Sequence, residues 1–253
     1  MGRLDGKVAV ITGAGSGLGR AMAARFATEG AAVLATDVDE AGGAATVAGL
    51  GRDARAAFRR CDVTDEADCA AAMADATARW GRLDIMVANA GIGGVLAPLV
   101  DLDRADWERV LAVNLTGVFL SAKHAFRAMR AGGGVILATA SVAGLEGTPR
   151  LGAYGPTKAG VIQLVRTLAL EGARHHIRAN ALCPVWIETP MVAGFIDAFR
   201  QPAEAMRQRL VADIPLGRLG TPDDVAAAAA YLASDDAAFI TGVAFPIDGG
   251  HLA

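Results

Sequence analysis

Short apolar runs alternate along the chain with alanine-rich stretches whose charges recur at helical spacing. The apolar runs have the length and the β-branched content of buried strands, and they occupy residues 7–12, 31–37, 84–91, 133–141 and 177–184. The stretches between them predict helices at 18–30, 65–80, 104–130 and 153–174. Strands that alternate with helices of this length form parallel βαβ units. The pattern therefore predicts an α/β fold, a doubly wound parallel sheet flanked by helices.

Residues 185–220 interrupt this alternation, because they contain no clear strand pattern. Apolar and aromatic side chains mix there with charges, and they include Trp186, Met191, Phe195 and Phe199. An irregular insertion of this size is typical of a substrate-binding segment, so we expect a lid; two ordinary surface helices are the alternative. No Pro/Ser-rich linker divides the chain, which predicts one domain over residues 1–253.

Composition narrows the function classes. The chain has 253 residues, 53% of them hydrophobic, and a net charge of −3 without a dense basic stripe, so we expect no nucleic-acid partner. The cysteines, Cys61, Cys69 and Cys183, are scattered and odd in number, which predicts reduced thiols and a cytoplasmic location. No long apolar run suggests a membrane segment, and the four histidines have no ligand spacing, so we expect neither membrane nor metal binding.

A glycine-rich turn, TGAGSGLG at 12–19, lies between the first predicted strand and the first helix. Glycines there allow a sharp turn and close approach of the backbone to a pyrophosphate, whose charge a helix N-terminus favours. The predicted cofactor-binding residues of this turn are Gly13, Ser16, Gly17, Leu18 and Gly19. Arg20 stands where the simple dinucleotide fingerprint has a third Gly or Ala.

Asp37 ends the second predicted strand, eighteen residues after Gly19 (37 − 19). A carboxylate at this place accepts hydrogen bonds from the ribose hydroxyls of NAD. Its alternative role is to cap the following helix, which aspartate also does well. The order of strand, glycine turn, helix, strand and acid favours NAD as the cofactor.

Together with later motifs, this order resembles the short-chain dehydrogenase/reductase family over nearly the whole chain. The motifs are Thr12-Gly13…Gly17-x-Gly19, CDV at 61–63, ANAG at 88–91, Asn114, Ser141, Tyr154-x-x-x-Lys158, PVWIETPM at 184–191 and IDGG at 247–250. Ser141 precedes Tyr154 by thirteen positions (154 − 141), the spacing of the family's catalytic serine and tyrosine. The resemblance implies a single-domain Rossmann-type fold with about seven strands and a homotetramer.

The resemblance also implies further cofactor contacts. Asp62 and Val63 would hold the adenine, and Asn89, Ala90 and Gly91 would pass beside the nicotinamide ribose, while Pro184, Ile187 and Thr189 would contact the carboxamide and phosphate side. The chain departs from the family's pattern at Ala88-Asn89, Pro184-Val185 and Pro156-Thr157. Of these, Val185 bears on the substrate, because it replaces a glycine at the floor of the site.

Tyr154 and Lys158 lie one helical turn apart on one face, in a chain with two tyrosines and only three lysines. A cation about 4 Å from a phenol, at an effective dielectric of about 20, contributes roughly 4 kcal/mol, or about 3 pKa units. We therefore expect Lys158 to lower the pKa of Tyr154 toward the working range of an acid/base, and to bind the ribose hydroxyls as well. A leftover surface charge is the alternative for Lys158.

Two more residues complete the predicted catalytic set. Ser141 would hydrogen-bond the carbonyl or alcohol oxygen, and by the resemblance Asn114 would hold a water that continues the proton relay from Lys158. Their alternatives are a turn-capping hydroxyl for Ser141 and an amide that bonds its own helix backbone for Asn114.

The sequence thus predicts an NAD(H)-dependent oxidoreductase that interconverts a secondary alcohol and a ketone, with Tyr154 as the acid/base. An NADP(H)-dependent 3-oxoacyl thioester (acyl carrier protein) reductase shares every catalytic motif and is the first alternative; Asp37 and Ser16 argue against it. A non-catalytic nucleotide-sensing protein on the same fold is the second. We expect a small to medium, largely uncharged substrate, while Glu146, Arg150 and Glu188 leave a polyol or a hydroxy acid open.

Overall fold

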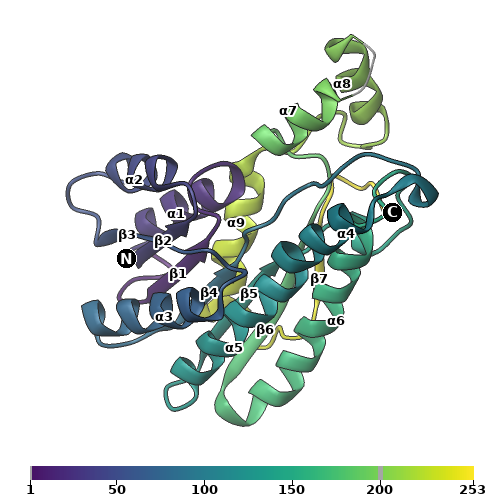
Figure 1. Cartoon of the computed structure of the whole chain (residues 1–253). Coiled ribbons are helices and arrows are strands. Elements are labelled where there is room, and N and C mark those ends of the chain that lie inside the picture. Colours follow the sequence, from purple (N-terminus) through teal and green to yellow (C-terminus); the bar gives the residue numbers. More distant parts are fainter. Residues whose placement is uncertain (1, 199–201) are drawn as a thin grey trace.

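The computed structural model describes residues 2–198 and 202–253, which form one parallel sheet with helices on both faces (Figure 1). The sheet has seven strands in the order β3-β2-β1-β4-β5-β6-β7, and each neighbouring pair is parallel. The strands are β1 (Val8–Thr12), β2 (Ala32–Asp37), β3 (Ala56–Arg60), β4 (Ile85–Ala88), β5 (Gly134–Thr139), β6 (Ile177–Pro184) and β7 (Ala244–Ile247). The strand order reverses direction between β1 and β4, which is where such sheets bind ligands.

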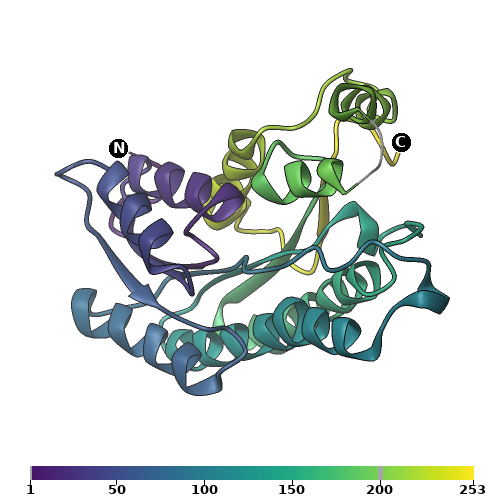
Figure 2. The ribbon, with the colours of Figure 1, turned by 45° about the horizontal axis from the view of Figure 1, so that its top comes forward.

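The two helix layers are separated by the sheet (Figure 2). One layer contains α1 (Gly17–Thr28), α2 (Glu40–Gly49) and α9 (Pro222–Ala233); the other contains α3 (Glu66–Trp80), α4 (Arg104–Leu111), α5 (Gly117–Met129) and α6 (Tyr154–Gly172). Alternate residues of a strand face opposite sides. Accordingly Val8 and Val10 join the core beneath α3, α5 and α6, while Ala9 and Ile11 join the core beneath α1 and α9. Burial on both faces explains why β1 is an uninterrupted apolar run.

The five strands predicted from the apolar runs are confirmed, and so is the doubly wound sheet. The edge strand β3 was not predicted, because it is only half-buried and its sequence, AAFRR, carries Arg59 and Arg60. The predicted helix 104–130 is divided into α4 and α5 by a π-helical turn at Ala112–Thr116. That turn contains Asn114, in keeping with the frequent occurrence of π turns at functional sites.

The expectation of irregular structure in 185–220 was wrong, and the alternative of two helices is confirmed: the segment forms α7 (Pro190–Asp197) and α8 (Ala203–Ala212). Thr189 caps α7 by accepting from the Val192 amide, and Pro190 occupies its first turn, where its missing N–H costs nothing. Beneath the helices lies a small core of their own, made of Ile196, Met206, Leu210, Ile214 and Leu219. The α7–α8 lobe projects from the body of the protein (Figure 1).

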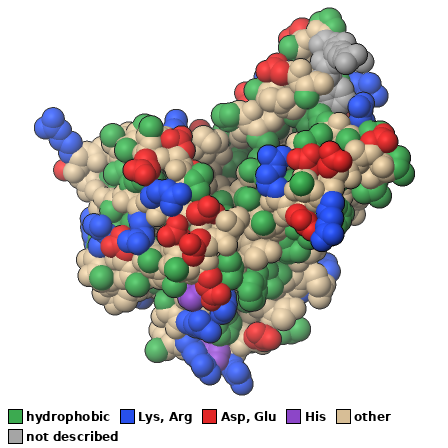
Figure 3. Space-filling view, in the orientation of Figure 1, with side chains coloured by type: hydrophobic (Ala, Val, Ile, Leu, Met, Phe, Trp, Pro, Cys, Tyr) green, Lys and Arg blue, Asp and Glu red, His purple; other side chains and the backbone are tan. Residues whose placement is uncertain are grey.

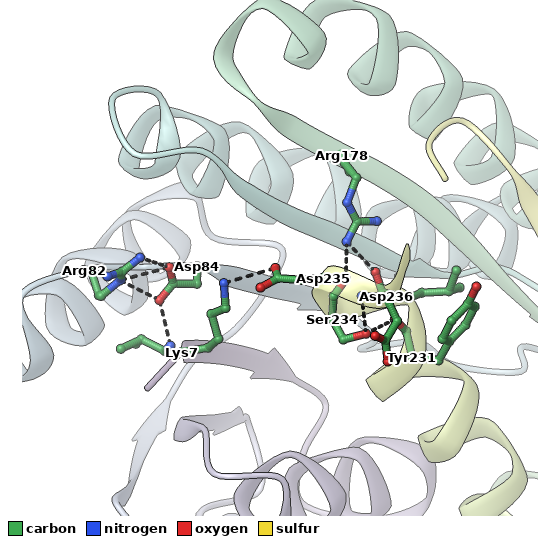
Figure 4. A network of polar contacts seen from close by, with 10 residues as sticks. Lys7, Arg82, Asp84, Arg178, Tyr231, Ser234, Asp235 and Asp236 are labelled. Carbon is green, nitrogen blue, oxygen red and sulfur yellow. Dashed lines mark hydrogen bonds and ion pairs between the residues drawn. The ribbon is translucent and has the colours of Figure 1, made fainter. Parts of the chain in front are cut away.

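A polar network fixes the amino-terminal ends of the strands (Figure 4). Asp84, just before β4, accepts from the Val8 amide of β1 at 2.9 Å and from Arg82 Nε at 2.9 Å. Arg178, at the start of β6, donates to the Leu232 and Ser234 carbonyl oxygens at the end of α9. These bonds align the strand starts, so the opposite, carboxyl ends of the strands are left to build a site.

Among the described residues, no helix combines the length and the apolar character that crossing a bilayer would require. Cys61, Cys69 and Cys183 are buried free thiols, as expected.

Candidate active site

A cavity of about 1020 Å³ opens at the carboxyl ends of the strands. The surface is hollowed between the projecting α7–α8 lobe and the body (Figure 3). The sequence-predicted residues that line the cavity are Gly13, Ser16, Gly17, Leu18, Asp37, Asp62, Val63, Asn89, Ala90, Gly91, Ser141, Tyr154, Lys158, Pro184, Ile187 and Thr189. Gly19 and Asn114 are not part of its wall. The structure therefore brings together residues that are spread over most of the chain.

The glycine turn is shaped as much by packing as by access to a ligand. Gly13 has a φ of 64°, and a Cβ there would lie 2.8 Å from the Ala90 Cα. A Cβ on Gly19 would lie 2.7 Å from the Asn89 Nδ2. Both glycines let the turn rest directly against the loop after β4. Gly19 thus lies behind the cavity wall, and its role is to let the turn pack against Asn89.

Asp37 holds the turn from the next strand. Its Oδ2 accepts from the Gly15 amide at 2.8 Å, and its Oδ1 accepts from the Asp39 amide at 2.9 Å. Asp39, and not Asp37, caps α2, with its Oδ1 accepting from the Gly42 amide at 3.0 Å. The helix-capping alternative for Asp37 was therefore wrong, and its carboxylate lies in the cavity wall beside the phosphate-loop candidate.

Asn89 joins three strand ends. Its Nδ2 donates to the Thr12 carbonyl oxygen at 3.0 Å, and its Oδ1 accepts from the Thr139 hydroxyl at 3.0 Å. The Thr12 hydroxyl accepts from the Asn89 and Ala90 amides. Strands β1, β4 and β5 are thereby tied together where the cavity begins. Farther out, hydrogen bonds from Thr64 lower the pKa of the Asp62 carboxyl, which keeps that wall negatively charged.

Tyr154 and Lys158 project from the first two turns of α6. Lys158 is only 3% exposed; its Nζ donates to the Thr139 carbonyl oxygen at 2.7 Å and lies 5.3 Å from the centroid of the Tyr154 ring. Burial lowers the pKa of Lys158 to about 8. The surface-charge alternative for Lys158 was therefore wrong.

The expected lowering of the phenol pKa was also wrong for this arrangement. Burial raises the pKa of Tyr154 above its usual value, and a hydrogen bond with Ser141 only partly offsets that rise. The physical reason is that burial removes the water that would stabilise a phenolate, while the Lys158 ammonium is directed to Thr139. At neutral pH the phenol is thus a protonated group, suited to donate.

Ser141 lies in the cavity wall and also caps a short turn. Its hydroxyl accepts from the Ala143 amide at 3.2 Å, which caps the short 3₁₀ turn Val142–Gly144, and donates to the Pro184 carbonyl oxygen at 3.3 Å. The capping alternative is therefore confirmed as one of its contacts, and it holds the hydroxyl in the cavity wall.

Asn114 is fully buried behind the wall. Its Nδ2 donates to the Ile92 carbonyl oxygen and its Oδ1 accepts from the Ile92 amide, both at 2.8 Å. The side chain thus bonds the loop after β4 and not its own helix, which overturns the alternative. A Cβ on Gly91 would lie 3.4 Å from the Asn114 Oδ1 and 3.5 Å from the Lys158 Nζ, so the two side chains flank that glycine.

Known proteins share this architecture. A family model described as "Enoyl-(Acyl carrier protein) reductase" matches residues 13–251. The cis-4-hydroxycyclohexanecarboxylate dehydrogenase of Sinomonas cyclohexanicum is 47% identical, over 98% of this chain and 97% of that protein. The levodione reductase of Leifsonia aquatica is 38% identical, over 99% of this chain and 96% of that protein. The chain belongs to the short-chain dehydrogenase/reductase family.

Solved structures agree. A levodione reductase structure superposes with a TM-score of 0.94 at 37% identity, covering 98% of each chain. A 3-ketoacyl-(acyl-carrier-protein) reductase from Brucella melitensis, complexed with NADH, gives a TM-score of 0.91 at 39% identity, covering 99% of this chain and all of that one. This short-chain dehydrogenase/reductase is accordingly an oxidoreductase of a fold that binds a nicotinamide cofactor.

Part of the wall of this enzyme's cavity is apolar. The rings of Trp186 and Phe195 lie 4.8 Å apart, and both residues line the cavity with Met191 and Val185. Phe199, expected among them, lies outside the described residues. Of the three charged candidates only Glu146 lines the cavity; Glu188 is exposed and pairs with Arg207, and Arg150 is not in the wall.

The polar wall residues that the sequence did not predict include Thr139, Thr148, Asp213 and His251. His251 was set aside because it has no ligand spacing, yet it lines the cavity and contacts Glu146. Its signal was the IDGG motif just before it, where Gly249 and Gly250 have φ values of 60° and 92°. Such a turn redirects the chain. No group of three or more metal-ligating side chains occurs in residues 2–198 and 202–253.

Proposed function

We propose that this protein is an NAD(H)-dependent oxidoreductase that interconverts a secondary alcohol and a ketone, with Tyr154 as the acid/base. The observation that carries the proposal is one cavity whose wall contains both the glycine turn with Asp37 and the set Ser141, Tyr154 and Lys158. When bound, the nicotinamide ring accepts or supplies the hydride. The residues needed to protonate the substrate oxygen and to hold the dinucleotide thus face a common space.

The residues of the cavity fit a dinucleotide. The turn Gly13–Gly19 presents backbone at the N-terminus of α1, which favours a pyrophosphate. Asp37 offers carboxylate oxygens for ribose hydroxyls, while Asp62 and Val63, which also line the cavity, would form the adenine side. Asn89, Ala90 and Gly91 would hold the nicotinamide ribose together with Tyr154 and Lys158, and Pro184, Ile187 and Thr189 the carboxamide side.

The proton moves through Tyr154. In ketone reduction the phenol, whose pKa burial raises, donates its proton to the carbonyl oxygen. Ser141 donates to the same oxygen, giving up its long 3.3 Å bond to the Pro184 carbonyl. Lys158 stabilises the resulting phenolate and supplies the replacement proton. Asn114 bonds the Ile92 backbone and so holds the neighbouring Gly91 beside Lys158. The water that Asn114 would hold to continue the proton relay from Lys158 is still a prediction.

Asp37 supports NAD over NADP. A 2′-phosphate beside this carboxylate would meet like charge. The alternative hypothesis is an NADP(H)-dependent 3-oxoacyl thioester reductase, and the likeness to a 3-ketoacyl-(acyl-carrier-protein) reductase supports it. That neighbour was itself solved with NADH, so the likeness does not argue for NADP.

The substrate is, we propose, a small to medium, largely uncharged alcohol or ketone. Trp186, Met191 and Phe195 give the cavity an apolar wall, and the segment 185–220 acts as the lid that carries it. A hydroxy acid is the rival substrate, raised by the name of the relative from Sinomonas cyclohexanicum. The buried free thiols favour a reducing, cytoplasmic location.

The test is a panel of neutral alcohols, the matching ketones, hydroxy acids and an acetoacetyl thioester, each assayed with NAD(H) and NADP(H). The near-ultraviolet absorbance of the reduced nicotinamide reports turnover. We expect the highest kcat/KM for a neutral alcohol or ketone with NAD(H). A clear preference for the thioester with NADPH would support the rival reading instead.

A further inference from the structure

Glu146 and His251 form a hydrogen-bonded pair in the cavity wall. The His251 Nε2 lies 2.9 Å from the Glu146 Oε1, and the His251 Nδ1 lies 2.9 Å from the Asp213 carbonyl oxygen. Glu146 belongs to the segment that joins Ser141 to Tyr154, and Asp213 follows the lid helix α8. The pair thus connects the catalytic loop, the lid and the C-terminus at one point.

The partners of the imidazole define its charge. A carboxylate and a backbone carbonyl both accept and do not donate, so each ring nitrogen must carry a proton to satisfy them. His251 in this arrangement is therefore an imidazolium. Burial alone would lower the pKa of His251, but its bonds to Glu146 and Asp213, and their charges, raise it above its usual value.

The C-terminal turn that carries His251 is firmly built. Asp248 accepts at its Oδ1 from the Gly250 amide and at its Oδ2 from the Leu252 amide, both at 3.0 Å. The Leu216 amide donates to the Gly249 carbonyl oxygen at 3.1 Å, which fastens the turn to the segment after α8. The C-terminus lies beside the α7–α8 lobe (Figure 2). His251 is thus placed by backbone contacts that do not depend on Glu146.

The charges of the wall disfavour an anionic substrate. Among the described residues that line the cavity, the cations are Lys158 and His251. Lys158 is directed to the Thr139 carbonyl oxygen, and both N–H groups of His251 are used. The acidic residues of the same wall are Asp37, Asp62, Glu146 and Asp213. Among the described residues of the wall, a substrate carboxylate would meet an excess of negative charge and no uncommitted cation.

Glu146 offers an acceptor instead. Its Oε1 is held by His251, while its Oε2 makes no hydrogen bond to any described residue. The side chain is 39% exposed, so that oxygen is open to a hydroxyl donor. Trp186 and Phe195 supply the apolar surface against which a carbon skeleton would lie.

We propose that Glu146, positioned by His251, is a specificity-determining residue that accepts a hydrogen bond from a second hydroxyl group of the substrate. The substrate class is then a neutral diol or polyol, or the corresponding hydroxyketone, and not a hydroxy acid. This inference rests on the proposed function, because it concerns the substrate of that same site.

The test uses three ring alcohols that differ only at one carbon: cyclohexanol, cyclohexane-1,4-diol and 4-hydroxycyclohexanecarboxylate, each with NAD. In the unmodified enzyme we expect kcat/KM for the diol to exceed that for cyclohexanol at least about tenfold, with the acid the poorest of the three. Glu146→Gln should reduce the preference for the diol over cyclohexanol to within about twofold and improve kcat/KM for the acid. Glu188→Gln, which changes an exposed glutamate outside the wall, is the matched control and should behave like the unmodified enzyme.

The proposed positioning of Glu146 by His251 is tested separately, through KM for the diol and the pH dependence of the diol preference. His251→Ala should raise KM for the diol with little change in kcat, because Glu146 loses its anchor and not its charge. In the unmodified enzyme the diol preference should decline as pH rises through the raised pKa of His251, whose neighbouring charged groups are Glu146 and Asp213. In His251→Ala the same preference should not vary with pH over that range.

The outcomes separate the two proposals. Turnover of the ring alcohols without a diol preference, an equal loss on all three compounds in Glu146→Gln, or a preference for the acid would overturn the specificity assignment alone. No turnover of any of the three with NAD or NADP, in protein that binds NAD, would overturn the proposed function and this inference with it.

Discussion

The Asp37 carboxylate accepts a hydrogen bond from the Gly15 amide at 2.8 Å. This bond holds the residue proposed to bind the ribose against the glycine turn proposed to bind the phosphates. Under the proposed function, this carboxylate would lie beside the 2′-phosphate of NADP. This single contact joins the local fold of two βα units to the choice of cofactor.

We predict that NAD exceeds NADP at least tenfold in kcat/KM and that Asp37→Asn removes most of this difference. Tenfold corresponds to about 1.4 kcal/mol, a modest demand on a clash between two anions. Asparagine keeps an oxygen for the Gly15 amide, so the turn should survive. Asp39→Asn is the control, since asparagine still caps α2 and the charge removed lies only two residues away. Equal use of both cofactors by the unmodified enzyme would contradict the role of Asp37.

Much of the fold could be predicted because strands that are buried on both faces appear in the sequence as short apolar runs. β1 and β4 are continuous apolar runs, and the helices along the chain keep their period. β3 could not be found in this way, because an edge strand with Arg59 and Arg60 lacks the apolar signal. Helices α7 and α8 were only the alternative to an irregular segment, because what orders them is the Thr189 cap and a separate small core, which no local pattern reveals.

The sequence predicted most of the residues that line the site, but it did not predict their hydrogen bonds or the directions of their pKa shifts. Spacing alone placed Tyr154 and Lys158 on one face, but it could not show that Lys158 would donate to Thr139. The direction of the Tyr154 pKa depends on burial, which is a property of the folded cavity. His251 could not be assigned because its partners, Asp213 and Glu146, are distant in sequence.

The buried Lys158 ammonium should leave a signature in the pH dependence of stability. Its pKa falls from 10.5 in the unfolded chain to about 8 when folded, so between these values the unfolded chain holds more protons. The free energy of unfolding should therefore rise with pH over this window, by up to about 3 kcal/mol relative to Lys158→Met. Urea titrations of both proteins from pH 7 to pH 10, without dinucleotide, measure the difference. A difference that stays constant across the window would contradict a buried, charged lysine.

We predict a homotetramer. The outer face of α6 carries Leu170, which is 83% exposed, and Phe239 is fully exposed ahead of β7. Large apolar side chains left in solvent mark surfaces that pack against a second copy. Light scattering at micromolar concentration should give four times the chain mass, and Leu170→Arg combined with Phe239→Arg should reduce it. Arg52→Glu, in the exposed loop before β3, is the control; a monomeric unmodified protein would contradict the prediction.

In the proposed mechanism Tyr154 transfers the proton, while the dinucleotide is held mainly by other residues. The most direct measurement is kcat for alcohol oxidation and Kd for NAD in Tyr154→Phe, with Lys158→Ala beside it. We predict that Tyr154→Phe loses at least about a thousandfold in kcat, within the range expected for removal of a general acid/base, and keeps its NAD affinity within a few-fold. Lys158→Ala should lose both, because Lys158 serves the phenol and the ribose. Near-normal turnover in Tyr154→Phe would contradict the mechanism.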